Sequence, residues 1–182
     1  IVVVSALGGV TDQLLRAARL ALESSEEYME EYQAIRHRHI EMINQLIDNP
    51  TTKQILLMEV EAILDELRSI LFGVHLVKDL SPKSEAVIVS YGEQLSSRIV
   101  TAALPGAVRK DSLEIICTDH KQGQVLLNTT LTEEKVKKAF AQMPHLAVCP
   151  GFISRDSQTG EITNLGRGGS DYTASILAAT LN

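Results

Sequence analysis

The sequence has no tryptophan and only two cysteines, Cys117 and Cys149, among its 182 residues. Two cysteines are too few for a disulfide framework, and both lie in apolar segments, which favours buried, reduced thiols. The sequence has no CxxC pair and no paired Cys/His spacing, so it predicts no zinc site. No apolar run approaches the ~20 residues of a membrane-spanning helix, and no basic leader opens the chain. We therefore expect a cytoplasmic protein without a membrane partner.

Positive charge is also scarce. The 17 Lys and Arg residues are outnumbered by 23 Asp and Glu residues, which gives a formal net charge of -6. With few aromatic residues and no basic stripe, a nucleic-acid partner is not expected. The remaining composition, 45% hydrophobic and 22% charged, is that of an ordinary globular protein. The length suits one domain or part of a larger one.

Strand-like and helix-like patterns alternate along the chain. The β-branched run at residues 1–4 predicts a buried strand, and a glycine turn then leads into a helix with Thr11 or Asp12 as its N-cap. The same order is expected at residues 86–104, with a strand at 86–89, a polar turn and a helix. Further strands are expected at 107–108, 114–117 and 146–149, a helix from Thr132, and a hairpin over 152–163.

Residues 26–80 carry two apolar stripes of helical period, separated at Pro50. They predict two long helices packed as an antiparallel hairpin inserted beside the sheet. The rest of the chain predicts an α/β fold with a mostly parallel sheet. In such folds ligands bind at the carboxyl ends of the strands.

Three loops that follow predicted strands carry polar residues. The loop before the last helix combines Arg167 with Gly168 and Gly169, and a glycine loop that leads into a helix N-terminus presents backbone N–H groups that suit a carboxylate or a phosphate. The alternative is an ordinary tight turn with Ser170 as the N-cap. Together the three loops contain a set of residues that suits a small zwitterion: Thr11, Glu93, Arg167, Ser170 and Asp171.

Three segments resemble motifs of the aspartate kinases, in family order. They are VVSALGGVTD at 3–12, SYGEQLS at 90–96 and LGRGGSDYTA at 165–174. The resemblance implies a three-layer αβα amino-acid kinase fold with a largely parallel central sheet. It also implies transfer of the ATP γ-phosphate to the side-chain carboxylate of L-aspartate. The product is 4-phospho-L-aspartate, on the route to lysine, threonine and methionine.

The resemblance also implies roles for individual residues. Asp171 matches the catalytic carboxylate that orients the active-site lysine, and Ser5 matches a position near the ATP phosphates. ATP with Mg²⁺ is the implied cofactor, with no metal ligand expected in this chain. The positions that match aspartate-binding residues are Thr11, Glu93, Arg167, Gly168, Gly169 and Ser170.

Other parts of the family pattern are absent from these 182 residues. A Lys-Phe-Gly-Gly strand precedes the first motif in the family, and the ATP-binding segment and ACT domains follow the last one. We therefore expect residues 1–182 to be the aspartate-binding part of a catalytic domain, with a helical insertion at about 26–80. The isolated fragment is expected to be inactive and the full-length protein to be a homo-oligomer; a monofunctional kinase and a fusion to homoserine dehydrogenase both stay open.

Two other functions stay open at this point. One is an amino-acid kinase acting on glutamate, an acetylated amino acid or a nucleotide. The other is a non-catalytic module for small-molecule binding or assembly, with the helical hairpin as its contact surface.

Overall fold

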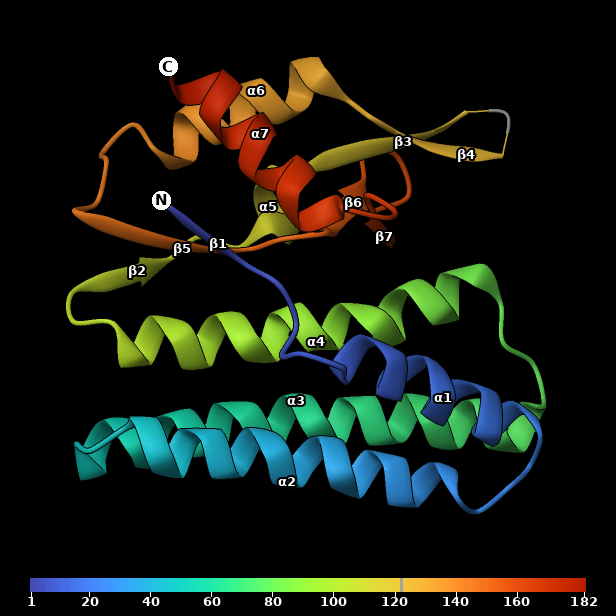
Figure 1. Ribbon diagram of the computed structural model, residues 1–182. Coiled ribbons are helices and arrows are strands. Elements are labelled where there is room, and N and C mark those ends of the chain that lie inside the picture. Colours follow the sequence, from blue (N-terminus) through green and yellow to red (C-terminus); the bar gives the residue numbers. More distant parts are fainter. Residues whose placement is uncertain (122) are drawn as a thin grey trace.

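The computed structural model describes residues 1–121 and 123–182. Figure 1 shows a bundle of four helices, α1 to α4, below the strands, with α6 and α7 above them. The elements in chain order are β1 (Val2–Val4), α1 (Val10–Leu22), α2 (Tyr28–Leu46), α3 (Pro50–Val77), α4 (Pro82–Ala103), β2 (Ala107–Arg109), α5 (Ser112–Ile115), β3 (Cys117–Lys121), β4 (Gln124–Leu127), α6 (Thr129–Ala139), β5 (Leu146–Pro150), β6 (Ile153–Asp156), β7 (Ile162–Asn164) and α7 (Gly169–Leu181).

The strands form two sheets. Sheet A has the order β1-β5-β2 and is parallel throughout, with Val3 beside Cys149 and Val108 beside Ala147. Sheet B has the order β4-β3-β6-β7; β3 and β6 are parallel, and the two outer pairs are antiparallel. Helices cover both faces of sheet A, so the predicted α/β fold with a parallel central sheet is confirmed. The strand expected at 146–149 and the hairpin over 152–163 are confirmed as β5 and as β6–β7.

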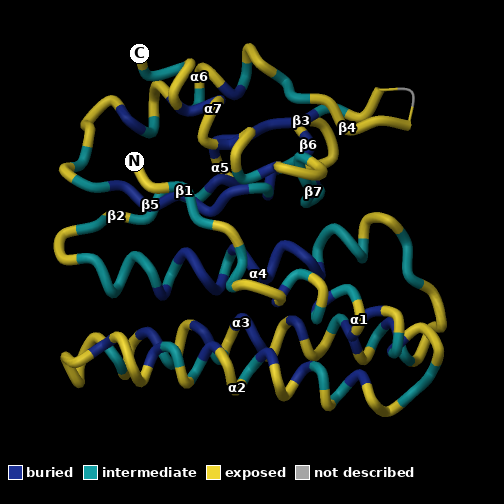
Figure 2. Tube along the Cα trace, in the orientation of Figure 1, coloured by how far each residue is buried: buried dark blue, intermediate teal, exposed yellow. Residues whose placement is uncertain are grey.

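The buried apolar side chains form two cores. One joins the four long helices through side chains such as Leu14, Leu64, Leu67 and Leu95. The other lies between sheet A and the helices α6 and α7 and includes Cys149 and Leu177. Figure 2 shows that buried positions follow β5 and the middle of α4. The two cysteines are buried and free, as predicted, and burial raises the pKa of the Cys149 thiol to about 11.

The predicted helical hairpin is confirmed as α2 and α3, which run side by side in opposite directions (Figure 1). Asn49 caps α3 by accepting a hydrogen bond from the Thr52 N–H at 2.9 Å, and Pro50 occupies the first helical position. The structure adds that the hairpin shares one core with α1 and α4. These four helices therefore form one helical bundle, in which α4 packs on the strands and α2 and α3 lie behind it (Figure 1).

The strand expected at residues 86–89 is wrong, because this segment lies inside α4. Ser81 is the N-cap of α4, its hydroxyl accepts from the Ser84 N–H at 3.1 Å, and Pro82 follows as the first helical residue. The buried side chains Ile88, Leu95 and Ile99 recur at helical spacing. A four-residue apolar run does not distinguish a strand from a buried helical turn.

Several predicted boundaries also differ. Residues 112–115 form the short helix α5, so the strand expected at 114–117 begins only at Cys117. Helix α6 starts at Thr129, with Asn128 as its cap, rather than at Thr132. Asn and Asp caps just upstream, here Asn128 and Asp111, set these starts.

The side-chain cap predicted for α1 is wrong, and the alternative in which Ser170 caps α7 is not found either. Helix α1 follows Gly9 and α7 follows Gly168, each in the left-handed conformation with φ of 82° and 73°. Neither helix start has a side-chain cap, so Thr11, Asp12 and Ser170 do not serve as N-caps. A left-handed glycine turns the chain into the helix without such a bond.

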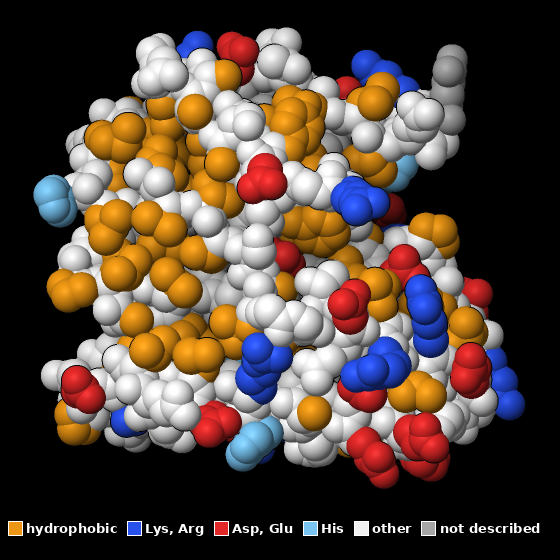
Figure 3. Space-filling model, in the orientation of Figure 1, with side chains coloured by type: hydrophobic (Ala, Val, Ile, Leu, Met, Phe, Trp, Pro, Cys, Tyr) orange, Lys and Arg blue, Asp and Glu red, His pale blue; other side chains and the backbone are white. Residues whose placement is uncertain are grey.

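The surface differs between the layers. Figure 3 shows side chains of both charges interspersed over the helical layer and more apolar surface near the strands. Ile1, Val2 and Val108, on or beside the edge strands of sheet A, are exposed apolar residues. Within the described residues, no helix combines the length and apolar character needed to cross a membrane.

Candidate functional site

A cavity of about 310 Å³ lies where the β1–α1 turn, the middle of α4 and the glycine loop before α7 meet. Ser5 follows β1, and Phe152 follows β5, so the cavity sits at the carboxyl ends of parallel strands. All eight residues singled out from the sequence line this one cavity, together with Phe152 and Gly166. The eight are Ser5, Thr11, Glu93, Arg167, Gly168, Gly169, Ser170 and Asp171.

Glu93 enters this cavity from α4 rather than from a loop. Its side chain is almost fully buried, and its Oε1 accepts the Ala6 N–H at 3.0 Å. Its Oε2 has no hydrogen-bond partner among the described residues. Burial raises the pKa of the Glu93 carboxyl to about 7, because desolvation disfavours the charged form. A buried acceptor without a partner is costly, so the site favours a ligand that donates to it.

The turn after β1 packs directly on α4 because residue 92 is glycine. A Cβ added to Gly92 would lie 2.7 Å from the Cβ of Ala6, closer than real contacts allow. Next to this contact, the Ser96 hydroxyl donates to the Ser5 carbonyl at 2.7 Å. These two contacts hold the β1–α1 turn, and with it Ser5 and Thr11, against the helix that carries Glu93.

The glycine loop presents the start of α7 to the cavity. Gly169 and Ser170 are the first two helical residues, and Arg167 and Asp171 are exposed. Among the described residues, neither Arg167 nor Asp171 forms an ion pair, and no side chain caps the helix. The Gly169 N–H donates to the Gly166 carbonyl at 3.0 Å. The N–H groups of Ser170 and Asp171 and the positive end of the helix dipole remain available to an anion.

The loop is fixed to the sheet by the connection between β5 and β6. The Phe152 N–H donates to Thr173 Oγ1 at 3.1 Å, and the Thr173 hydroxyl donates to the Gly169 carbonyl at 2.9 Å. The Leu165 N–H donates to the Phe152 carbonyl at 2.8 Å. Phe152 itself has a φ of 65°, a conformation that a bulky residue rarely adopts. The bonds at its N–H and carbonyl hold it in this geometry.

Two glycines make this connection possible. A Cβ on Gly151 would lie 2.6 Å from the Cβ of Ser170, and one on Gly169 would lie 2.8 Å from the ring of Phe152. Gly151, Phe152 and Thr173 were not identified from the sequence. The only signal for them was the Pro-Gly pair after the buried strand, together with the position of Thr173 in the last motif.

The described residues contain no group of three or more His, Cys, Asp and Glu side chains placed to hold a metal ion. Asp171 and Glu93 are the two carboxylates at the cavity, and Glu93 is already bonded to the Ala6 N–H. The site thus combines one guanidinium, a buried carboxylate with a free oxygen, hydroxyls and free N–H groups. This set is complementary to a small molecule that carries both a carboxylate and an ammonium group.

The sheet, its helical layers and the strand-end cavity define an α/β protein with a small-molecule site. More specifically, the chain belongs to the amino acid kinase family, whose model matches residues 1–182. Aspartokinase 1, chloroplastic, of Arabidopsis thaliana is 31% identical over 192 residues, covering 100% of this chain and 32% of that protein. Lysine-sensitive aspartokinase 3 of Escherichia coli is 28% identical over 190 residues, covering 100% of this chain and 40% of the relative.

Solved structures agree with the sequence comparison. E. coli aspartokinase III in complex with lysine and aspartate matches with a TM-score of 0.85 and 27% identity, over 98% of this chain and 40% of that one. The same enzyme in complex with aspartate and ADP matches with a TM-score of 0.83 and 28% identity, over 98% and 39% of the two chains. The chain thus spans about a third to two-fifths of the length of these relatives. The predicted resemblance to aspartate kinases and their fold is confirmed.

Proposed function

We propose that this chain is the aspartate-binding part of an aspartate kinase, which transfers the γ-phosphate of ATP to the side-chain carboxylate of L-aspartate. The observation that carries the proposal is the single cavity lined by all eight motif residues. Relatives named aspartokinase match the whole chain, and one neighbouring structure is a complex with aspartate and ADP.

Arg167 and Glu93 bind the amino-acid end of aspartate in this proposal. The Arg167 guanidinium takes the α-carboxylate through two parallel hydrogen bonds. The ammonium group donates to the free Oε2 of Glu93, which removes the unsatisfied acceptor and stabilises the charged carboxylate. Thr11, Ser170 and the N–H groups of the glycine loop complete the binding set.

The side-chain carboxylate of aspartate needs no base, because it is ionised at neutral pH. The reaction then depends on position and on neutralising the negative charges that meet. Ser5 and the uncapped start of α7 would face the transferred phosphate, and Asp171 would orient a lysine. ATP with Mg²⁺ supplies the phosphoryl group and the charge that offsets it.

We further propose that this lysine and most of the nucleotide site come from parts of a longer protein. The chain spans only 32% and 40% of the two aspartokinases compared above. By itself it should therefore show little or no kinase activity. We also propose that the full-length protein is cytoplasmic and homo-oligomeric, as expected from the sequence.

The test uses the full-length protein, with aspartyl phosphate trapped as the hydroxamate. We expect ATP-dependent product from L-aspartate and far less from L-glutamate or N-acetyl-L-glutamate. Glu93→Ala and Arg167→Ala should each weaken aspartate binding in calorimetry by about 100-fold, as expected for a lost charged hydrogen bond. The exposed controls Glu114→Ala and Arg19→Ala should bind normally. Unchanged affinity in both site variants would refute the assignment, and binding without turnover would favour a non-catalytic module.

A further inference from the structure

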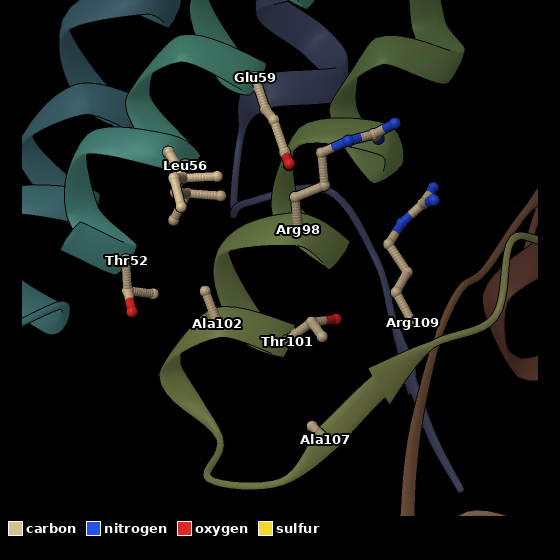
Figure 4. A pocket seen from close by; sticks show the side chains of 9 residues that line it. Thr52, Leu56, Glu59, Arg98, Thr101, Ala102, Ala107 and Arg109 are labelled. Atoms are coloured by element: carbon tan, nitrogen blue, oxygen red, sulfur yellow. The ribbon is translucent and has the colours of Figure 1, made fainter. Parts of the chain in front are cut away.

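A second cavity of about 310 Å³ lies between the start of α3, the end of α4 and β2. It shares no lining residue with the first cavity. Figure 4 shows Leu56 and Glu59 of α3 facing Arg98 and Ala102 of α4, with Ala107 of β2 below them. The motifs found in the sequence do not include these residues, and the proposed kinase reaction does not use them.

The cavity has an apolar floor. Leu56 is buried, and Ala102 and Ala107 add small side chains to the wall. Ile55 also lines the cavity and is 54% exposed. An aliphatic group of modest size would cover this surface and remove it from water.

Opposite charges stand on the two helices that form the walls. Figure 4 shows the Glu59 side chain extending from α3 toward Arg98 of α4. Neither residue forms an ion pair within residues 1–121 and 123–182. The Arg98 guanidinium donates through Nη1 to the Gln94 carbonyl at 2.8 Å, which leaves its other donors free for a ligand.

The neighbouring arginine has two of its nitrogens engaged, while its buried Nη2 has no partner among the described residues. Arg109 donates through Nε to the Ser97 hydroxyl at 2.9 Å and through Nη1 to Asp111 at 3.0 Å. Partial burial and then the charge of Arg109 lower the pKa of Arg98, while Asp111, Glu59 and Glu66 act in the opposite direction. Arg98 is therefore a partly desolvated cation without a direct counter-ion, and a bound carboxylate would stabilise it.

We propose that this cavity binds an α-amino acid with an aliphatic side chain. The carboxylate of the ligand lies on Arg98, its ammonium group on Glu59, and its side chain on Leu56 and Ala102. The inference does not depend on the proposed kinase function, because the two sites have no residue in common.

The test is methyl NMR of the full-length protein with labelled isoleucine, leucine and alanine. L-Leucine is the probe, and saturating L-aspartate is present to fill the first cavity. Two analogues lack one charge each: 4-methylpentanoate has no ammonium group, and 3-methylbutan-1-amine has no carboxylate. We expect saturable shifts of the methyl groups of Ile55, Leu56 and Ala102 with L-leucine, and at least tenfold weaker binding of each analogue.

Variants separate the two charges from the shape of the cavity. Arg98→Met and Glu59→Gln should each weaken L-leucine binding at least tenfold, and Ala102→Leu should block it by filling the floor without changing a charge. Arg19→Met and Glu114→Gln, outside the cavity, should leave it unchanged.

Absence of these methyl shifts would overturn the proposal, as would equal binding by the parent and by all three cavity variants. Binding of 4-methylpentanoate as tight as that of L-leucine would overturn the zwitterion assignment. The affinity for aspartate should stay the same in every variant, which keeps this result separate from the test of the kinase site.

Discussion

Replacing Glu93 with glutamine tests whether the candidate site holds a destabilising charge. Glutamine keeps the size of the side chain and its Oε1 acceptor for the Ala6 N–H, but it does not titrate. In the folded chain the Glu93 carboxyl has a pKa of about 7 instead of 4.5, because it is buried. The substitution thus removes a group that is charged at pH 8 and largely neutral at pH 5.

The size of the effect follows from this shift. Between pH 4.5 and 7 the folded chain holds the Glu93 proton more tightly than the unfolded chain does. The free energy of unfolding therefore falls as the pH rises through this range. The total loss is roughly 3 kcal/mol, since each pKa unit corresponds to about 1.4 kcal/mol. The Glu93→Gln variant has no titrating group at this position and does not undergo this loss. At pH 8 its free energy of unfolding should therefore exceed that of the parent by up to the same amount.

Urea unfolding at pH 5, 6, 7 and 8 measures the difference, with Glu114→Gln as an exposed control. We expect the gap between Glu93→Gln and the parent to widen in favour of the variant as the pH rises. The same variant should lose aspartate affinity, because a neutral amide attracts an ammonium group less than a carboxylate does. A gap that is equal at pH 5 and pH 8 would refute the reasoning that the carboxyl is desolvated.

Three further variants test the framework of the site and of sheet B. Gly151→Ala places a Cβ 2.6 Å from that of Ser170, so the start of α7 must move; we expect a loss of about 1–3 kcal/mol in urea unfolding. Thr173→Val removes both hydrogen bonds of the buried Thr173 hydroxyl and should cost about 1–3 kcal/mol, whereas Thr173→Ser retains the hydroxyl and most of the stability. Asp156→Asn should destabilise the chain at pH 7, because backbone and side-chain donors hold the pKa of Asp156 well below its usual range. That contribution begins to decrease once the pH falls below the ordinary aspartate pKa of about 4 and is lost only as the pH falls through the lowered pKa of the folded chain, so the gap measured by urea unfolding should narrow by pH 3.

Each of these outcomes has a contrary result. A Gly151→Ala variant with parental stability and aspartate affinity would show that α7 accommodates the added methyl group. Equal stability of the valine and serine variants at position 173 would show that the hydrogen bonds of the Thr173 hydroxyl do not stabilise the loop. An Asp156→Asn gap that stays constant from pH 7 to pH 3 would contradict the lowered pKa.

Local patterns were sufficient for much of the fold. Strands β1 and β5 were predicted because their apolar runs are short and lie next to glycine turns, and α2 and α3 because their stripes keep helical period over many turns. The same reasoning failed at residues 86–89, where four apolar residues fit both periods. Ser81 and Pro82 begin the helix that includes residues 86–89, but a serine-proline pair also occurs in turns and loops, so it did not identify this helix from the sequence.

The sequence was sufficient to name eight residues that line one cavity in the structure. It did not show how deeply these residues are buried or which groups they contact. The burial of Glu93, its bond to Ala6 and its raised pKa depend on two segments that are 87 residues apart and touch through a glycine. The hydrogen bond between Phe152 and Thr173 likewise forms only when separate elements pack. The same holds for the placement of Glu59 and Arg98 at the second cavity. Desolvation and close contact result from this packing of distant segments, so they become visible only in the folded chain.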